Sequence, residues 1–379
     1  MSGAQGVGHC FDNKPAFNRF TGASLLLESK RPDDSPSTPQ GPACNAELLL
    51  CGHGCGYSPG MQPLWVRSLW LVLAGTLFFV AIGVVVSWAP DVPVEELKSR
   101  WAPPPSRFIE VNGMQVHLRD EGPHDDPAPI VLLHGTSSSL QTWQGWAVAL
   151  RDQRRVIRFD LPGFGLTGPN RQNDYSTAAD VLFVRSVMDK LGVQRFVLAG
   201  NSLGGLVAWT AAARMPDRVD RLILVDAAGY PPQSLASPQQ MPLGFRIARM
   251  PWLRALAGYI LPRGLIETSL RQLYGDPAKV TPDQVDLYFA MARRAGNREA
   301  LGRRLDLLQP ADLSLLKTVK APTLILWGGR DRLLPLEMGR RFEDDIAGSH
   351  LVVFDDLGHI PQEEDPKRTV AAVKRFLGL

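Results

Sequence analysis

One pentapeptide in the chain has the spacing expected of a nucleophilic serine. Gly200-Asn201-Ser202-Leu203-Gly204 fits Gly-x-Ser-x-Gly, in which the serine lies on a tight strand-to-helix turn and its neighbours must be small. A serine hydroxyl is a weak nucleophile at neutral pH, so this chemistry also needs a base that takes its proton. The helix that follows offers free N–H groups and a partial positive charge to a developing oxyanion. The motif therefore indicates nucleophilic catalysis, provided that a strand precedes it and a helix follows it.

Short apolar segments alternate with helical ones after residue 106 and provide that context. Apolar runs predict strands at residues 108–111, 115–119, 130–133, 156–159, 196–199, 222–225, 324–327 and 351–354. Helical spacing predicts helices at residues 178–191, 203–215 and 369–377. This alternation is typical of an α/β protein with a doubly wound, mostly parallel sheet. Because ligands bind beyond the carboxyl ends of such strands, catalytic residues should directly follow the apolar runs.

Four further motifs accompany the serine motif in a fixed order. They are HGTSSS at 134–139, DLPGFGLTGP at 160–169, WGGRDRLLP at 327–335 and GHIPQEEDP at 358–366. Together with GNSLGG at 200–205, they make residues 106–379 resemble the α/β-hydrolase fold superfamily, and within it bacterial serine esterases and lipases. The resemblance implies an α/β-hydrolase fold with an inserted helical lid, and we expect neither a cofactor nor a metal.

The resemblance also implies a catalytic triad, whose members Ser202, Asp331 and His359 each follow a predicted strand. In this interpretation Ser202 is the nucleophile, and His359 is the base that takes its proton and returns it to the leaving group. Asp331 fixes the tautomer of the imidazole and stabilises the imidazolium that forms.

Two backbone N–H groups complete the predicted site, and the acid has competitors. The oxyanion is expected to rest on the N–H groups of Thr136 and Leu203, the first from the HGTSSS loop and the second directly after the serine. Asp226 is an alternative acid, because it follows an earlier strand and some relatives place the acid there. Asp355 and Asp356 are further competitors, but the Gly-Arg-Asp sequence after an apolar strand favours Asp331.

The alternation stops between Gly229 and Val319, where helical patterns predict an inserted lid at about residues 229–319. Its apolar side chains are candidates for an acyl pocket: Leu243, Phe245, Trp252, Leu253, Tyr259, Ile260, Tyr288 and Phe289. The leading hypothesis is a carboxylesterase or lipase that acts on a small-molecule ester or lipid through an acyl-enzyme. One alternative is a serine-type C–C bond hydrolase of ring-cleavage diketones. Another is a non-catalytic binding protein on the same fold.

The first 90 of the 379 residues differ in composition from the rest. All four cysteines lie within residues 1–60, which show no sustained helical or strand period. This stretch is expected to be a disordered leader, or no part of the native protein if translation starts at Met61. The cluster CGHGC at 51–55 is a poor zinc site, because structural zinc sites favour two paired clusters of ligands. The net charge of +3 gives no support to nucleic-acid binding.

An uncharged apolar run of 21 residues at 69–89 is long enough to cross a bilayer, within a segment assigned to residues 61–90. We interpret it as an uncleaved anchor rather than a signal peptide, whose apolar core usually has about 7–15 residues. Arg67 precedes the run, whereas Asp91, Glu95 and Glu96 follow it, which predicts a cytoplasmic N-terminus and an exported domain on the periplasmic or extracellular side. Residues 91–105 are expected to form a linker to the catalytic domain at 106–379.

Overall fold

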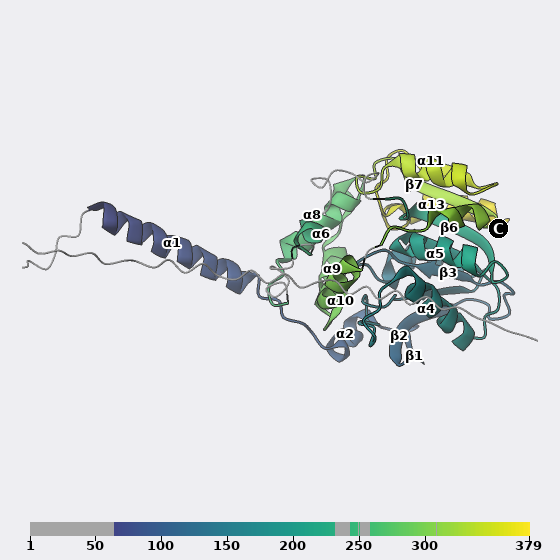
Figure 1. Cartoon of the computed structure of the whole chain (residues 1–379). Coiled ribbons are helices and arrows are strands. Elements are labelled where there is room, and N and C mark those ends of the chain that lie inside the picture. Colours follow the sequence, from purple (N-terminus) through teal and green to yellow (C-terminus); the bar gives the residue numbers. More distant parts are fainter. Residues whose placement is uncertain (1–63, 232–242, 249, 251–257, 308) are drawn as a thin grey trace, which may run out of the picture. The chain divides into compact units, whose positions relative to one another are not determined.

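The computed structural model describes residues 64–379 apart from 232–242, 249, 251–257 and 308 (Figure 1). The predictions for residues 1–60, which include the cysteine cluster, and for the start at Met61 lie outside the described residues. Trp252 and Leu253 of the predicted acyl pocket also lie outside them.

An eight-stranded sheet with the order β1-β2-β4-β3-β5-β6-β7-β8 forms the centre of the fold. β1 and β4 each pair with β2 in antiparallel fashion, and the remaining neighbours are parallel. The strands are β1 (Arg107–Val111), β2 (Met114–Glu121), β3 (Ile130–Leu133), β4 (Val156–Phe159), β5 (Phe196–Ser202), β6 (Val219–Ala227), β7 (Thr323–Gly328) and β8 (His350–Phe354). The predicted α/β-hydrolase sheet is confirmed, and every predicted strand lies within an observed one.

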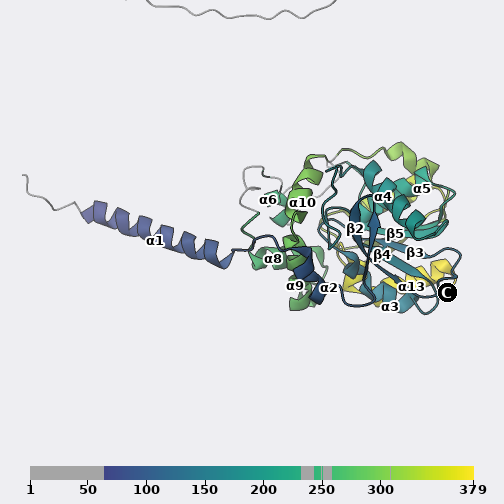
Figure 2. The same ribbon diagram turned by 90° about the horizontal axis from the view of Figure 1, so that it is seen from below.

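Helices cover both faces of this sheet, which explains why its strands are apolar runs rather than alternating patterns. A buried hydrophobic cluster lies on each face of the sheet. In β3, Val131 and Leu133 belong to the cluster on one face, whereas Ile130 and Leu132 belong to the cluster on the other. Figure 2 shows helices on the two sides of the strands. One face packs against α3 (Gln144–Leu150) and α13 (Pro366–Leu377), and the other against α4 (Thr177–Lys190), α5 (Leu203–Arg214) and α11 (Leu336–Asp345).

Between β6 and β7 the chain leaves the sheet and forms a group of helices, which we call the lid helices (Figure 1). They are α6 (Leu243–Ala248), α8 (Arg263–Leu273), α9 (Pro282–Arg293) and α10 (Asn297–Asp306). α9 begins with a capping box, in which the Thr281 hydroxyl accepts from the Gln284 N–H and the Gln284 side chain accepts from the Thr281 N–H. Leu316, near the end of the predicted lid at 229–319, is buried in the core of the sheet domain, so the separate helical region ends before that residue.

The helix α1 (Leu64–Val86) contains most of the apolar run that suggested an anchor. At 1.5 Å per residue, its 23 residues span about 34 Å, enough to cross a hydrocarbon core. None of its side chains is buried, and within the described part of the chain it is the one helix that is long and apolar enough to span a membrane.

The segment directly after α1 is bound to the lid helices. We call residues 87–92 the connecting segment. Its Ala89 N–H donates to the carbonyl of Tyr259 at 2.8 Å, and its Val92 N–H donates to the carbonyl of Arg293 at 2.7 Å. The helix α2 (Val94–Trp101) follows and packs beside Met291 of the lid. Residues 91–105, predicted as a linker, are therefore packed against the domain over α2, because their backbone and apolar groups find partners there.

Candidate active site

Ser202 occupies a strained turn at the carboxyl end of β5. Its φ of 53° and ψ of −116° place it in a region that residues other than glycine rarely adopt. The chain is so close-packed here that a Cβ on Gly200 would lie 2.1 Å from the carbonyl oxygen of Gly204. A Cβ on Gly204 would lie 2.3 Å from the carbonyl oxygen of Leu133. The two glycines of the motif are therefore required by the path of the backbone that presents Ser202.

His359 and Asp331 form a buried pair at the same edge of the sheet. Asp331 follows β7 and His359 follows β8, and the two atoms His359 Nδ1 and Asp331 Oδ2 are 2.7 Å apart. The other oxygen, Oδ1, accepts the N–H groups of Leu333 and Leu334 at 2.7 and 2.9 Å. A carboxylate that accepts at every oxygen places the hydrogen of the imidazole on Nδ1, which leaves Nε2 as a proton acceptor.

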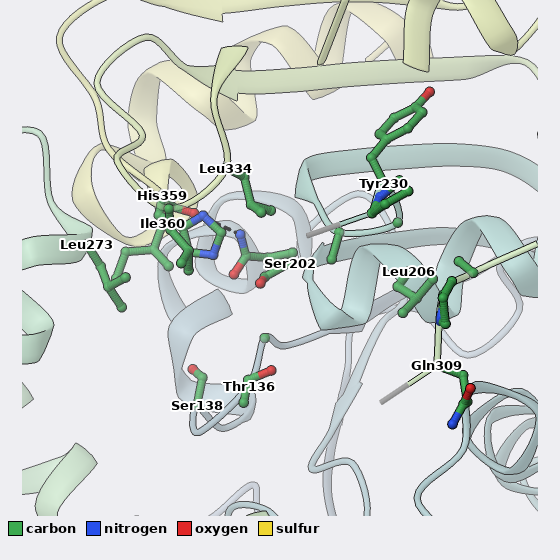
Figure 3. Close-up of a pocket in the computed structure, with 18 of the residues that line it drawn as sticks. Thr136, Ser138, Ser202, Leu206, Tyr230, Leu273, Gln309, Leu334, His359 and Ile360 are labelled. Carbon is green, nitrogen blue, oxygen red and sulfur yellow. Dashed lines mark hydrogen bonds between the residues drawn. The ribbon is translucent and has the colours of Figure 1, made fainter. Parts of the chain in front are cut away.

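Ser202 and His359 line one cavity of about 350 Å³ together with Thr136 (Figure 3). Much of the remaining wall is apolar and includes Leu206, Leu273, Leu334, Ile360 and Ala311. Among the described residues that line it, none carries a lysine, arginine, aspartate or glutamate side chain. The cavity therefore suits an uncharged, largely apolar substrate group next to the serine.

The loop after β3, which contains Gly135 and Thr136, passes beside Ser202. A Cβ on Gly135 would lie 3.1 Å from the Cβ of Ser202, so this loop passes directly beside the serine. The His134 ring fixes the loop, because its Nδ1 lies 2.7 Å from the Gly135 carbonyl and its Nε2 accepts from the Leu161 N–H at 2.9 Å. Burial lowers the pKa of His134, which keeps this ring neutral. Leu203 is the first residue of α5, so its N–H has no acceptor within the helix.

Asp226, the alternative acid, lies beside the pair but bonds elsewhere. The ligand atoms of Asp226, Asp331 and His359 all lie within 4.8 Å of one another. Asp226 Oδ1 accepts the Gly328 N–H at 2.9 Å, and the carboxyl is fully buried. Burial, and then the charge of Asp331, raise the pKa of Asp226 well above its usual value. Two adjacent buried carboxyl groups cannot both be charged at low cost, and the geometry favours Asp226 as the protonated one, because Asp331 pairs with His359 and accepts two backbone N–H groups. Of the two further competitors, Asp355 is exposed, and Asp356 is half-exposed and pairs with Arg368.

Asn201 is a residue of the site that the sequence did not reveal. Its side-chain amide donates to the carbonyl of Val225 at 3.1 Å and to that of His359 at 3.0 Å. It therefore ties the serine turn to the loop that carries the histidine. The first x position of the serine motif accepts many residue types, so this role had no signal in the sequence.

Glu363 is a second such residue and fixes part of the cavity wall. It accepts the hydroxyl groups of Tyr288 and Tyr274 at 2.9 and 3.1 Å, and the Tyr288 hydroxyl also lies 3.2 Å from Ser138 Oγ. Of the predicted acyl-pocket residues, Tyr288 lines the cavity, whereas Leu243 and Tyr259 are exposed.

The chain belongs to the α/β-hydrolase family. Residues 128–366 match the family described as alpha/beta hydrolase fold, which covers more than half of the chain. Ser202 at the end of β5, Asp331 after β7 and His359 after β8 all lie within those residues.

Sequence and structural relatives support a hydrolase of this fold. An uncharacterized protein of Mycobacterium tuberculosis is 32% identical over 73% of this chain and 82% of its own length. A 2-hydroxy-6-oxo-2,4-heptadienoate hydrolase of Pseudomonas putida is 29% identical over 72% of this chain and 95% of its own. The crystal structure of a bacterial membrane phospholipase A is similar with a TM-score of 0.62 and 25% identity, covering 83% of this chain and 97% of that one.

Proposed function

We propose that the protein hydrolyses carboxylic esters through an acyl-enzyme, with Ser202, His359 and Asp331 as its catalytic triad. One observation carries this proposal. A strained serine and a histidine that is held by a buried aspartate line the same cavity at one edge of the sheet. Serine needs a base to become nucleophilic, and the base needs a third group that fixes its tautomer.

In the first half of the reaction, Ser202 Oγ attacks the carbonyl carbon of the ester while His359 Nε2 takes the hydroxyl proton. Asp331 stabilises the imidazolium. The negative charge that develops on the carbonyl oxygen is held by the N–H groups of Thr136 and Leu203, which cost no reorganisation because the loop and α5 are already fixed. The C–O bond of the ester then breaks, and His359 returns the proton to the departing alcohol.

In the second half, water takes the place of the alcohol. His359 removes a proton from the water as its oxygen attacks the acyl carbon, and the same two N–H groups hold the second oxyanion. The bond between Ser202 Oγ and the acyl group breaks, the proton returns to Oγ and the carboxylic acid leaves. The residues of the site are thereby restored without a cofactor.

A serine-type C–C bond hydrolase is the second candidate, because the Pseudomonas putida relative is named as a heptadienoate hydrolase. A dienoate carries a carboxylate, which proteins usually hold with arginine or lysine. The described lining of the catalytic cavity contains neither residue and is mainly apolar. This difference supports the ester substrate over the dienoate.

We further propose that α1 is an uncleaved membrane anchor and that the catalytic domain is exported. α1 has the length and the exposed apolar surface of a span, and the similar crystal structure is that of a membrane phospholipase A. Arg67 lies near the start of α1, while Asp91, Glu95 and Glu96 follow its end. This distribution supports a cytoplasmic N-terminus.

The test compares wild type with Ser202→Ala on p-nitrophenyl butanoate. We expect kcat to fall by about 10⁴-fold or more, since the nucleophile is lost while the fold remains. Ser186→Ala is the control, because Ser186 lies on α4 and contacts Asn112 rather than the cavity, and it should leave the rate unchanged.

Two results would contradict the proposal. Hydrolysis that survives in Ser202→Ala would exclude the triad. Turnover of 2-hydroxy-6-oxo-2,4-heptadienoate by a wild type that leaves simple esters intact would establish the C–C bond hydrolase in its place.

A further inference from the structure

A second cavity of about 640 Å³ lies between the lid helices, and neither Ser202 nor His359 lines it. Residues of α6, α8, α9 and α10 line it. Its volume is within the range of small-molecule binding sites. Its apolar wall consists mainly of Ile247, Ile260, Leu261, Leu265, Ile266 and Leu270.

The two cavities share part of their walls. Thr136, Leu273 and Tyr288 line both of them. Thr136 provides one of the proposed oxyanion donors, so the two cavities adjoin at the position of the reacting carbonyl group. An ester has one substituent on each side of that position, its acyl chain and its alcohol.

The second cavity adjoins the catalytic one on the side of His359. The His359 N–H donates to the carbonyl of Leu273 at 2.7 Å, so this shared wall residue is bonded directly to the histidine backbone. Figure 3 shows Leu273, Ile360 and His359 on one side of Ser202, and Leu206, Tyr230 and Gln309 on the other. Because His359 must give its proton to the departing oxygen, the alcohol leaves on the His359 side. The acyl chain then extends towards Leu206 and Tyr230.

Four of the five charged residues in the described lining of the cavity form two ion pairs at its α10 end. Arg298 lies 2.5 Å from Asp91, and Arg303 lies 2.7 Å from Glu299. A ligand in this cavity would therefore contact apolar side chains along α8 and ion-paired side chains at the α10 end. Such a wall favours an alkyl chain over a charged group, since burying an unpaired charge is costly.

The wall is also attached to the end of the proposed anchor. Ile260, which lines the cavity, forms a β-bridge with Trp88, and the Leu261 N–H donates to the carbonyl of Ser87 at 2.9 Å. Both partners belong to the connecting segment that directly follows α1. An anchor in the bilayer would keep this cavity near the membrane surface, where long-chain esters partition.

We infer that the cavity between the lid helices binds the alcohol part of the substrate, and that this alcohol carries a long alkyl chain. The inference rests on the proposed ester hydrolysis and adds to it the substrate class, an ester with apolar chains on both sides of the carbonyl group. The catalytic cavity takes the acyl chain, and the second cavity takes the chain of the alcohol.

Two isomeric esters separate the two sides of the carbonyl group. Dodecyl butanoate and butyl dodecanoate have the same formula, but the long chain is in the alcohol of the first and in the acyl group of the second. The test compares their kcat/KM values in the full chain, in one detergent. Ser269→Phe adds bulk to the second cavity from α8, and its effect is read as the ratio of the two values.

We expect Ser269→Phe to lower the ratio of kcat/KM for dodecyl butanoate to kcat/KM for butyl dodecanoate by about tenfold or more. The phenyl group would fill the apolar pocket, so the long chain of the alcohol would no longer fit there. Thr268→Phe is the matched control, because Thr268 is the exposed neighbour on the same helix and should leave the ratio unchanged. Ala292→Phe fills the cavity from α9 and carries the same test if Ser269→Phe does not fold.

The inference is wrong if filling the cavity leaves the ratio unchanged or raises it, since a raised ratio would place the acyl chain there. A failure of the proposed function looks different. In that case wild type hydrolyses neither isomer, or Ser202→Ala hydrolyses both at the wild-type rate.

Discussion

The two adjoining cavities are built in different ways. The catalytic cavity takes its reacting groups from the carboxyl end of β5 and from loops that follow β3, β7 and β8, and the serine turn beside it has backbone contacts too close for a single added methyl group. The second cavity lies between helices of an insertion, and residues of four different helices line it. In the lid, a Cβ on Gly264 of α8 would meet no atom within 4 Å.

This difference separates chemistry from specificity. A reacting group must be held within a fraction of an ångström, which a sheet edge with interlocking backbone achieves. A pocket for an alkyl chain needs volume and apolar surface, which a helical insertion can provide with many sequences. We therefore expect substitutions near the sheet to change rates and folding strongly, and substitutions in the lid to change selectivity or to have small effects.

The largest effect on kcat is expected from substituting Asp331, and it should distinguish the role of Asp331 from that of Asp226, the second buried carboxyl group beside His359. Asp331→Asn should lower kcat by about 10⁴-fold, because an amide no longer holds the required tautomer of His359. Asp226→Asn should lower it by about tenfold at most, because Asp226 already carries a proton and its Oδ1 contact with the Gly328 N–H can be kept. Steady-state kinetics on p-nitrophenyl butanoate measures both. The reverse order of the two effects would make Asp226 the catalytic acid.

The stability of Asp226→Asn gives a second measurement on the same variant. The folded state raises the pKa of Asp226, so above the unfolded pKa of about 3.8 the unfolded chain releases a proton that the folded protein retains. Wild type then loses stability as the pH rises, and the asparagine variant does not share this loss. The free energy of unfolding of the variant relative to wild type should therefore increase from pH 4 to pH 7, as measured with urea. A constant difference would mean that Asp226 is charged.

A smaller effect is expected from Gly204→Ala, which probes the packing of the serine turn. The new Cβ would lie 2.3 Å from the Leu133 carbonyl oxygen and 2.7 Å from that of His134, and both contacts are with backbone atoms. The strand or the helix must move, which should cost about 3 kcal/mol of unfolding free energy and lower kcat as well. Urea unfolding and ester hydrolysis measure these losses. Unchanged values of both would show that the serine turn can accommodate a methyl group without rearrangement.

The sheet and its reacting residues were predictable because their constraints are local. β3 was predicted with its observed bounds, since four consecutive apolar residues between polar loops permit little else. The positions of Asp331 and His359 were predicted from a family resemblance, and the structure places the two side chains in contact.

The parts that were not predicted depend on contacts between distant segments. Asn201 donates a hydrogen bond to the carbonyl of a residue 158 positions away, and Glu363 accepts hydrogen bonds from the hydroxyl groups of two lid tyrosines. Residues 91–105 were predicted as a linker because their partners, Arg293 for Val92 and Met291 for α2, lie far along the chain. The second cavity could not be foreseen for the same reason, since it exists only where four helices meet.

The smallest effect on stability is expected from a glycine-to-alanine substitution in the lid, which is the counterpart of Gly204→Ala at the sheet. Gly264→Ala changes an exposed position in the first turn of α8, where the added methyl group meets nothing and the helical backbone suits alanine. The variant should be more stable than wild type by about 0.5 kcal/mol, because alanine loses less conformational freedom on folding than glycine. Slower hydrogen exchange of the α8 amides would measure this gain even if the lid opens separately from the sheet. A loss as large as that of Gly204→Ala would mean that the lid is packed as tightly as the sheet edge, and the division between a rigid chemical site and an adaptable specificity site would fail.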